Sequence, residues 1–93
     1  MRLIDIDRLE MVDDHIHYRK RYEASIILMD NKHQIKRNAI SFSIEYRPVG
    51  DPLIDIKFIN ADNIMMDKLI PKVKQKITQL DHDGVLAALH RKN

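Results

Sequence analysis

The chain has 93 residues, 44% of them hydrophobic, and a formal net charge of +2 at pH 7. This composition supports one small domain with a hydrophobic core, residues 1–93, and argues against a wholly disordered chain. The absence of cysteine excludes disulfides, thiolate chemistry and cysteine-ligated zinc. No apolar run is long enough to span a membrane, and the acidic N-terminal segment is unlike a signal peptide. We therefore expect a cytoplasmic protein without a membrane partner.

The first segment, residues 3–11, is expected to form a strand that turns back at residues 12–14. If the position numbers of paired residues sum to about 26, Ile4 and Ile6 lie on the same buried face. Residues 7–11 could equally form a helical turn, and the sequence leaves this alternative open.

Three further stretches carry large apolar residues at even positions only, which is typical of strands with one buried face. Their members are Ile16, Tyr18, Tyr22, Ala24, Ile26 and Leu28, then Ile40, Phe42, Ile44 and Tyr46, then Ile54, Ile56 and Phe58. A position sum of 64 between the second and third strands sets Tyr22 opposite Phe42 and Ala24 opposite Ile40. This register leaves a three-residue turn at residues 31–33.

The third and fourth strands are expected to pair with a position sum near 100, which sets Ile44 beside Ile56 and Phe42 beside Phe58. A loop at residues 48–52 closes this hairpin, because its two prolines cannot donate to a ladder. We expect Phe42, Ile56 and Phe58 at the centre of the core.

A helical stripe follows the strands, formed by Met66, Leu69, Ile70, Val73, Ile77 and Leu80. Asp62 or Asn63 should cap its start and Gly84 should end it. Pro71 either kinks one long helix or begins the main helix, and the unbroken stripe favours the kink. The sequence thus predicts an α+β fold of the ββββα type: a four-stranded antiparallel meander sheet with one face covered by a C-terminal helix. Val85, Leu86 and Leu89 leave room for a short final helix.

The second hairpin, from about residue 25 to residue 39, should project beyond the fourth strand, which would end near Asn60. Near its tip, Ile27, Met29 and Ile35 fall on the face opposite the core. A two-stranded ribbon that is apolar on both sides is marginal in water and needs a partner. The leading hypothesis is therefore a small non-catalytic binding or assembly module that forms a homodimer through these three residues.

The second strand also places four basic side chains on the exposed sheet face: His15, His17, Arg19 and Arg21. Such a row could follow a phosphate backbone. An ordinary solvated face is the competing interpretation, because acidic residues lie across from the row and the aromatic residues lie on the buried face. The order of four strands and a helix is similar to that of the PUR and Whirly nucleic-acid-binding repeats, whose sequence motifs are not matched. Nucleic-acid binding is the alternative function.

The segment that most resembles a metal site contains Asp14, His15 and His17. Two histidines at positions i and i+2 of a strand project to the same side, and a neighbouring carboxylate could complete the site. Metal binding is the third hypothesis. Two glycines are too few for a glycine-rich phosphate loop, and no nucleophile elbow surrounds the serines. We name no catalytic residue and expect no cofactor; the sequence favours a non-catalytic role without deciding it.

Overall fold

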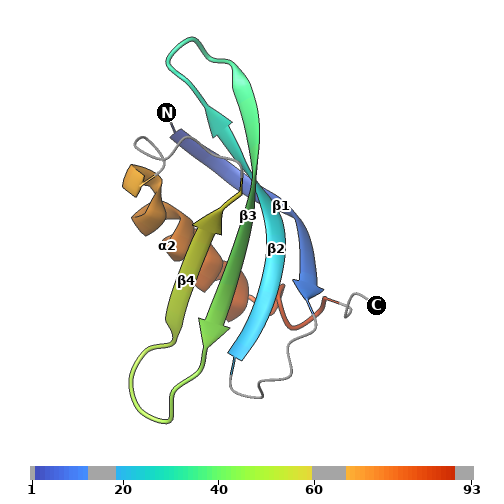
Figure 1. Ribbon diagram of the computed structural model, residues 1–93, viewed down its shortest axis with the longest axis vertical. Coiled ribbons are helices and arrows are strands. Elements are labelled where there is room, and N and C mark those ends of the chain that lie inside the picture. The colour runs from blue at the N-terminus through green and yellow to red at the C-terminus, as the bar shows by residue number, and fades with distance from the viewer. Residues whose placement is uncertain (1, 13–18, 60–66, 90–93) are drawn as a thin grey trace.

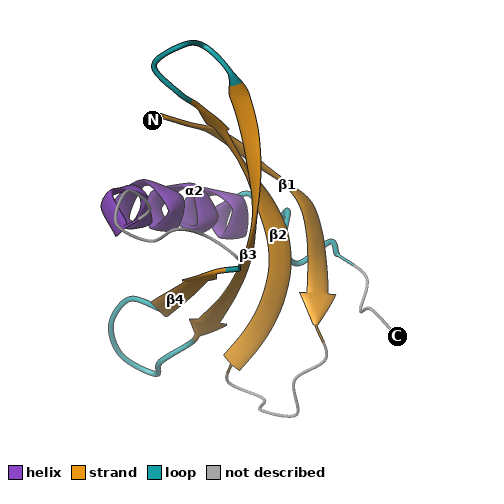
Figure 2. Ribbon diagram, turned by 45° about the horizontal axis from the view of Figure 1, so that its top comes forward, coloured by secondary structure: helices purple, strands orange, loops and turns teal. Residues whose placement is uncertain are grey.

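The computed structural model describes residues 2–12, 19–59 and 67–89. These contain the strands β1 (Arg2–Val12), β2 (Arg19–Met29), β3 (Ile35–Glu45) and β4 (Leu53–Phe58), the short 3-10 helix η1 (Asp67–Leu69) and the α-helix α2 (Ile70–His82). The strands form one antiparallel sheet in the order β1-β2-β3-β4 (Figure 1). The sheet curves, and α2 lies on its concave side (Figure 2). The predicted ββββα fold is confirmed.

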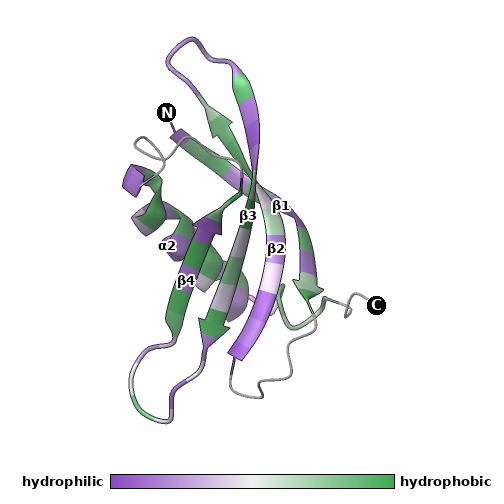
Figure 3. Ribbon diagram, in the orientation of Figure 1, coloured by the Kyte–Doolittle hydropathy of each residue, from purple (hydrophilic) through white to green (hydrophobic). Residues whose placement is uncertain are grey.

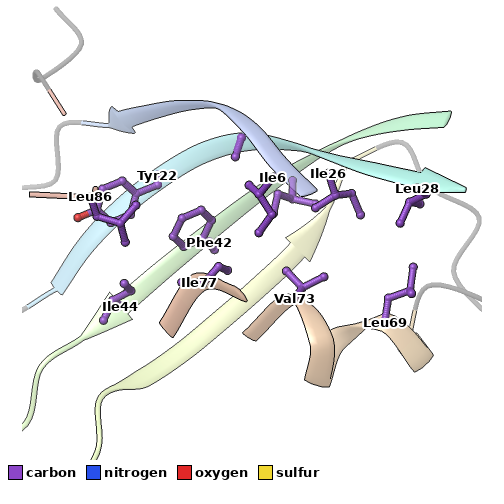
Figure 4. Close-up of a cluster of buried hydrophobic side chains, with 12 residues drawn as sticks. Ile6, Tyr22, Ile26, Leu28, Phe42, Ile44, Leu69, Val73, Ile77 and Leu86 are labelled. Atoms are coloured by element: carbon purple, nitrogen blue, oxygen red, sulfur yellow. The ribbon is translucent and has the colours of Figure 1, made fainter. Parts of the chain in front are cut away.

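The hydrophobic core lies between the concave face of the sheet and α2. Hydrophobic and hydrophilic residues alternate along the strands, so that one face of the sheet is apolar (Figure 3). The buried members are Ile6, Tyr22, Ala24, Ile26, Leu28, Ile40, Phe42, Ile44, Leu69, Val73, Ile77 and Leu86 (Figure 4). Val73 and Ile77 are one helical turn apart and therefore point to the same side of α2. No helix in the described ranges is long and apolar enough to cross a membrane.

The central hairpin has the predicted register. Tyr22 pairs with Phe42 and Ala24 with Ile40, and the stacked rings of Tyr22 and Phe42 have centroids 5.0 Å apart. At the turn, the Asp30 backbone N–H donates to the Gln34 carbonyl oxygen (3.0 Å), which leaves the predicted three residues between them. The Asp30 carboxylate holds this turn from outside.

That carboxylate accepts hydrogen bonds from the backbone N–H groups of Lys32 and Gln34, both at 2.9 Å. The bond from Gln34 is the largest of several effects that lower the pKa of Asp30, followed by a small opposing effect of burial and by the contributions of Lys32 and Lys36. His33 has a φ of 60°, in the left-handed region that the third position of such a turn requires.

The predicted register between β3 and β4 is wrong by one residue pair. Ile44 pairs with Ile54 and Phe42 with Ile56, so the position sum is 98 instead of about 100. The loop is longer than expected because β3 ends at Glu45. Tyr46 leaves the sheet, and its hydroxyl donates to the Asp81 carboxylate of α2 at 3.0 Å.

The shift of two positions keeps the predicted faces, but it does not place β4 at the centre of the core. Phe42 is 2% exposed. Ile56 and Phe58 are only half-buried, because β4 is the last strand of the sheet.

The predicted register of β1 is also wrong. Position sums run from 31 at Leu3 to 33 at Val12 rather than near 26, with irregularities between Leu3 and Asp5 and between Asp7 and Glu10. Each irregularity adds one residue to β1 and therefore changes which face the following residues occupy. Ile6 is buried as expected, whereas Ile4 is 41% exposed. The whole of residues 2–12 is extended, so the helical-turn alternative is wrong. Ile16 and Tyr18, expected in the second strand, lie outside the described residues.

The α-helix begins beside Pro71 instead of passing through it. Pro71 lies in the first turn of α2, where its missing N–H would have no helical partner. The kinked-helix interpretation is therefore wrong for the described residues, and the predicted caps Asp62 and Asn63 lie outside them, as does Met66.

Gly84 ends the helix as predicted, with a φ of 79°. The Val85 backbone N–H donates back to the Leu80 carbonyl oxygen (3.0 Å), a bond typical of a helix that stops at glycine. The following residues form turns rather than a final helix, and they bring Leu86 into the core.

Candidate functional site

The face of the sheet that points away from α2, here called the outer face, carries the odd-numbered side chains of β2, β3 and β4. The observed registers set Arg21, Ser43 and Asp55 in one row across three strands. Glu23, Ser41 and Lys57 form the next row. Small serines on β3 are thus flanked on both sides by longer charged residues.

A hollow of about 280 Å³ lies over these rows. Half-buried Ser41 and Ser43 form its floor, since their side chains are shorter than their neighbours. Arg19 and Arg21 line it from β2, and Asp55 and Lys57 line it from β4; the Phe42 main chain lies between the serines. The arrangement is a trough along β3 with one basic wall and one mixed wall.

The trough has a modest excess of positive charge, because three cationic side chains and one carboxylate line it. Within the described ranges, no carboxylate lies within ion-pair distance of Arg21 or Lys57. Glu23 and Glu45 lie on the same face and offset this charge. The arrangement suits an anionic group bound between Arg21 and Lys57 over the serine hydroxyls.

The structure brings together only part of the predicted basic row. Arg19 and Arg21 lie on the outer face as expected, whereas His15 and His17 lie outside the described residues. Sequence reasoning missed the serine floor and Lys57. The alternation of small and long side chains on neighbouring strands would have revealed the trough once the β3–β4 register was correct.

The outer face of the β2–β3 hairpin is apolar near its tip. We define the hairpin face as Ile27, Met29 and Ile35. Met29 pairs with Ile35 across the hairpin. Ile35 is 58% exposed, whereas Ile27 and Met29 are half-buried.

Two contacts account for the partial burial of the hairpin face. β1 pairs with β2 as far as Met29, which faces Arg2, so the expected two-stranded ribbon is supported along one side by a third strand. Arg37 Nη1 also reaches from β3 to both carboxylate oxygens of Asp7 on β1, at 2.6 and 2.7 Å. This ion pair crosses β2 beside Ile27, which lies between Asp5 and Arg37 in the register.

A tyrosine and aspartate contact joins the sheet to the end of α2. Burial, and then the neighbouring Asp81 carboxylate, raises the pKa of Tyr46 above its usual range. The same two causes raise the pKa of Tyr22. Both effects keep the phenols protonated, so that the Tyr46 hydroxyl donates to Asp81 and fastens α2 to the β3–β4 loop. We assign this contact a structural role.

The predicted metal segment, Asp14, His15 and His17, lies outside the described residues. Among residues 2–12, 19–59 and 67–89, no group of three or more histidine, aspartate or glutamate side chains could hold a metal ion.

Comparison with known families gives one match: the model of the BB-0187 family covers residues 1–82, so the chain belongs to this family. No match was found among the curated proteins. No solved structure matches either. The family name states no activity, ligand or partner, so function has to be argued from the surfaces described above.

Proposed function

We propose that this family member is a small non-catalytic binding and assembly module that forms a homodimer. The observation that carries the proposal is the hairpin face, where Ile35 is 58% exposed beside Ile27 and Met29, outside the core. The hairpin extends beyond β4 (Figure 1), so that a second copy could approach this face. Apolar side chains grouped on a projecting element are typical of an interaction site.

The energy available from this face is modest. Full burial of one large apolar side chain contributes about 1.5–3 kcal/mol. Ile27 and Met29 are already half-buried, so most of the gain comes from Ile35. Association also costs translational and rotational freedom, and we therefore expect a dimer that dissociates on dilution.

Light scattering across the micromolar range tests the proposal. The unmutated protein should have the mass of a dimer, and the double variant Ile27→Asp and Ile35→Asp should be monomeric, because it places charges on the hairpin face. The matched control is Val49→Asp, at a loop residue that is 86% exposed. Circular dichroism should show that the sheet is retained in both variants. A monomer at high micromolar concentration in the unmutated protein would refute homodimer formation.

Nucleic-acid binding is the second candidate function, and the trough is the observation that favours it. Arg19, Arg21 and Lys57 border a groove with hydroxyl groups at its base, which is suited to phosphate contacts. Two features weigh against it: acidic residues share the face, and Tyr22 and Phe42 are buried on the other side of the sheet, where they cannot stack on bases.

A gel-shift assay with single-stranded RNA and DNA at two salt concentrations tests this candidate. Binding should weaken steeply as salt rises, because phosphate contacts release counterions. The double variant Arg19→Glu and Arg21→Glu should abolish binding, whereas Lys74→Glu, on the exposed side of α2, should leave it intact. No retention at low salt would exclude this function.

A further inference from the structure

The outer margin of β4 offers backbone groups for pairing. No described strand pairs with β4 on the side away from β3 (Figure 1). The Ile59 N–H donates to the Ala39 carbonyl oxygen at 3.0 Å, so Ile59 directs its backbone groups towards β3. Because the direction of these groups alternates along a strand, Ile54, Ile56 and Phe58 direct theirs outward.

Nothing in β4 blunts this margin. Its register with β3 is unbroken from Leu53 to Phe58, and the strand contains no proline. Leu53 is 47% exposed and Ile59 is 39% exposed, while the inward-facing Ile54 and Ile56 are only half-buried. A flat apolar edge of this kind is a template for pairing with another strand.

We propose that β4 pairs with β4 of a second copy, antiparallel, around a two-fold axis at Ile56. In this register each residue meets a complementary one: Leu53 meets Ile59, Ile54 meets Phe58, Asp55 meets Lys57, and Ile56 meets its own counterpart. The contact covers apolar side chains on both faces of the strand and forms two ion pairs. The inference rests on the proposed self-assembly, but it names a contact separate from the hairpin face.

Charge and backbone direction select this register. A shift of one residue pair sets Asp55 against Asp55 or Lys57 against Lys57, and like charges directly opposite one another are destabilising. A slip by a single residue would bring core-facing residues to the outer face. In the proposed register the outward backbone groups of Ile54, Ile56 and Phe58 all find partners. The two sheets become one continuous sheet with both copies of α2 on the same face.

A charge-exchange experiment tests the register. Asp55→Lys and Lys57→Asp each change exposed residues, and each alone sets two like-charge pairs across the axis. The dissociation constant of the dimer should rise on the order of tenfold at low salt for either variant. An equimolar mixture of the two variants should restore association, as a heterodimer, because the complementary pairs then re-form. Unchanged homodimers of both variants would overturn the proposed register.

A backbone substitution tests the edge itself without relying on charge. Ile56→Pro removes an N–H that points away from β3, which an edge strand tolerates, and should abolish the β4 contact. Ile56→Ala loses more of the side chain but keeps the N–H, so it should weaken association less. Circular dichroism serves to show that both variants keep the sheet. A proline variant that associates as well as the alanine variant would refute edge pairing.

The masses separate this inference from the proposed function. A monomeric unmutated protein overturns both. A dimer that is broken by the hairpin double variant but not by Ile56→Pro supports the proposed function and overturns the β4 contact. A dimer broken by Ile56→Pro alone supports the β4 contact and self-assembly, and overturns the hairpin face as the interface. A dimer broken by both sets of variants, or a tetramer that each set reduces to a dimer, supports both contacts.

Discussion

The two edges of the sheet differ in how they treat an approaching strand. β1 is long and is interrupted between Leu3 and Asp5 and again between Asp7 and Glu10, and Arg8 has a φ of 53°. β4 is short, but it keeps one register with β3 throughout. Bulges and charged residues are common protections of edge strands. The comparison teaches that one edge is closed by its own backbone while the other remains suited to pairing.

The helix strengthens this difference. Lys76 of α2 lies 3.5 Å from the Asp5 carboxylate of β1, and a hollow bordered by Ile4, Lys72 and Gln75 separates the two elements. The polar side of α2 therefore runs along the start of β1. A strand added at β1 would meet these side chains as well as an irregular backbone.

The largest expected effect comes from the core that both edges share. Phe42 lies on β3 and is 2% exposed, so Phe42→Ala should lower the free energy of unfolding by about 3–5 kcal/mol. Denaturant unfolding monitored by circular dichroism measures this loss. A loss below about 1 kcal/mol would contradict the position of Phe42 at the centre of the core.

Matched truncations on the two edges should sharpen the comparison. Ile6→Ala on β1 should cost about 2–4 kcal/mol, because Ile6 is 5% exposed and its loss leaves a cavity. Ile56→Ala on β4 should cost about half as much, since Ile56 is only half-buried. Unfolding measured at a concentration where the protein is monomeric removes the contribution of association. Equal losses would show that β4 is as firmly held as β1.

Deleting Arg8 should break the comparison by making β1 resemble β4. Asp7 pairs with Ser25 and Glu10 with Glu23, so the bulge contains one extra residue, and its deletion restores regular alternation. We expect a folded protein whose flatter β1 edge increases association, measured as a higher mass in light scattering. Arg8→Gly is the control, because it relieves the left-handed conformation but keeps the bulge. Greater association in the control than in the deletion variant would contradict the protective role of the bulge.

The smallest expected effect concerns the ion pair at β1. Asp7→Asn removes the contact with Arg37, whose side chains are 35% and 43% exposed, respectively. Exposed ion pairs contribute about 0.2–1 kcal/mol, and the loss should shrink further at high salt. Thermal unfolding at two salt concentrations measures it. A large loss that does not depend on salt would indicate that the pair acts mainly by covering Ile27.

The sequence predicted the fold wherever alternation was regular. The even-numbered apolar residues of β2 and β3 gave the register of Tyr22 and Phe42 correctly, because a turn of defined length follows Asp30. It failed at β1, where two added residues change the faces in a way that no apolar pattern encodes. It was two positions out at β4, because the bond between Tyr46 and Asp81 draws Tyr46 out of the sheet.

The candidate sites were predicted less completely than the fold. Arg19, Arg21 and Ile35 could be assigned to the outer face from position parity alone. The trough depends on which residues of β4 lie beside Ser41 and Ser43, and a register error of one pair hides that neighbourhood. The partial cover of Ile27 depends on a contact between strands that are not neighbours, which a sequence pattern does not show.

The meander order of the strands has a kinetic consequence. Each strand pairs with the one that precedes it in the chain, so the sheet can form by successive closure of short loops, which is entropically less costly than pairing distant segments. The Asp30 turn makes the β2–β3 hairpin the natural nucleus, and α2 can only dock once an apolar face exists. Folding-rate measurements should therefore give substitutions at the Asp30 turn high φ-values, and substitutions at Val73 low ones.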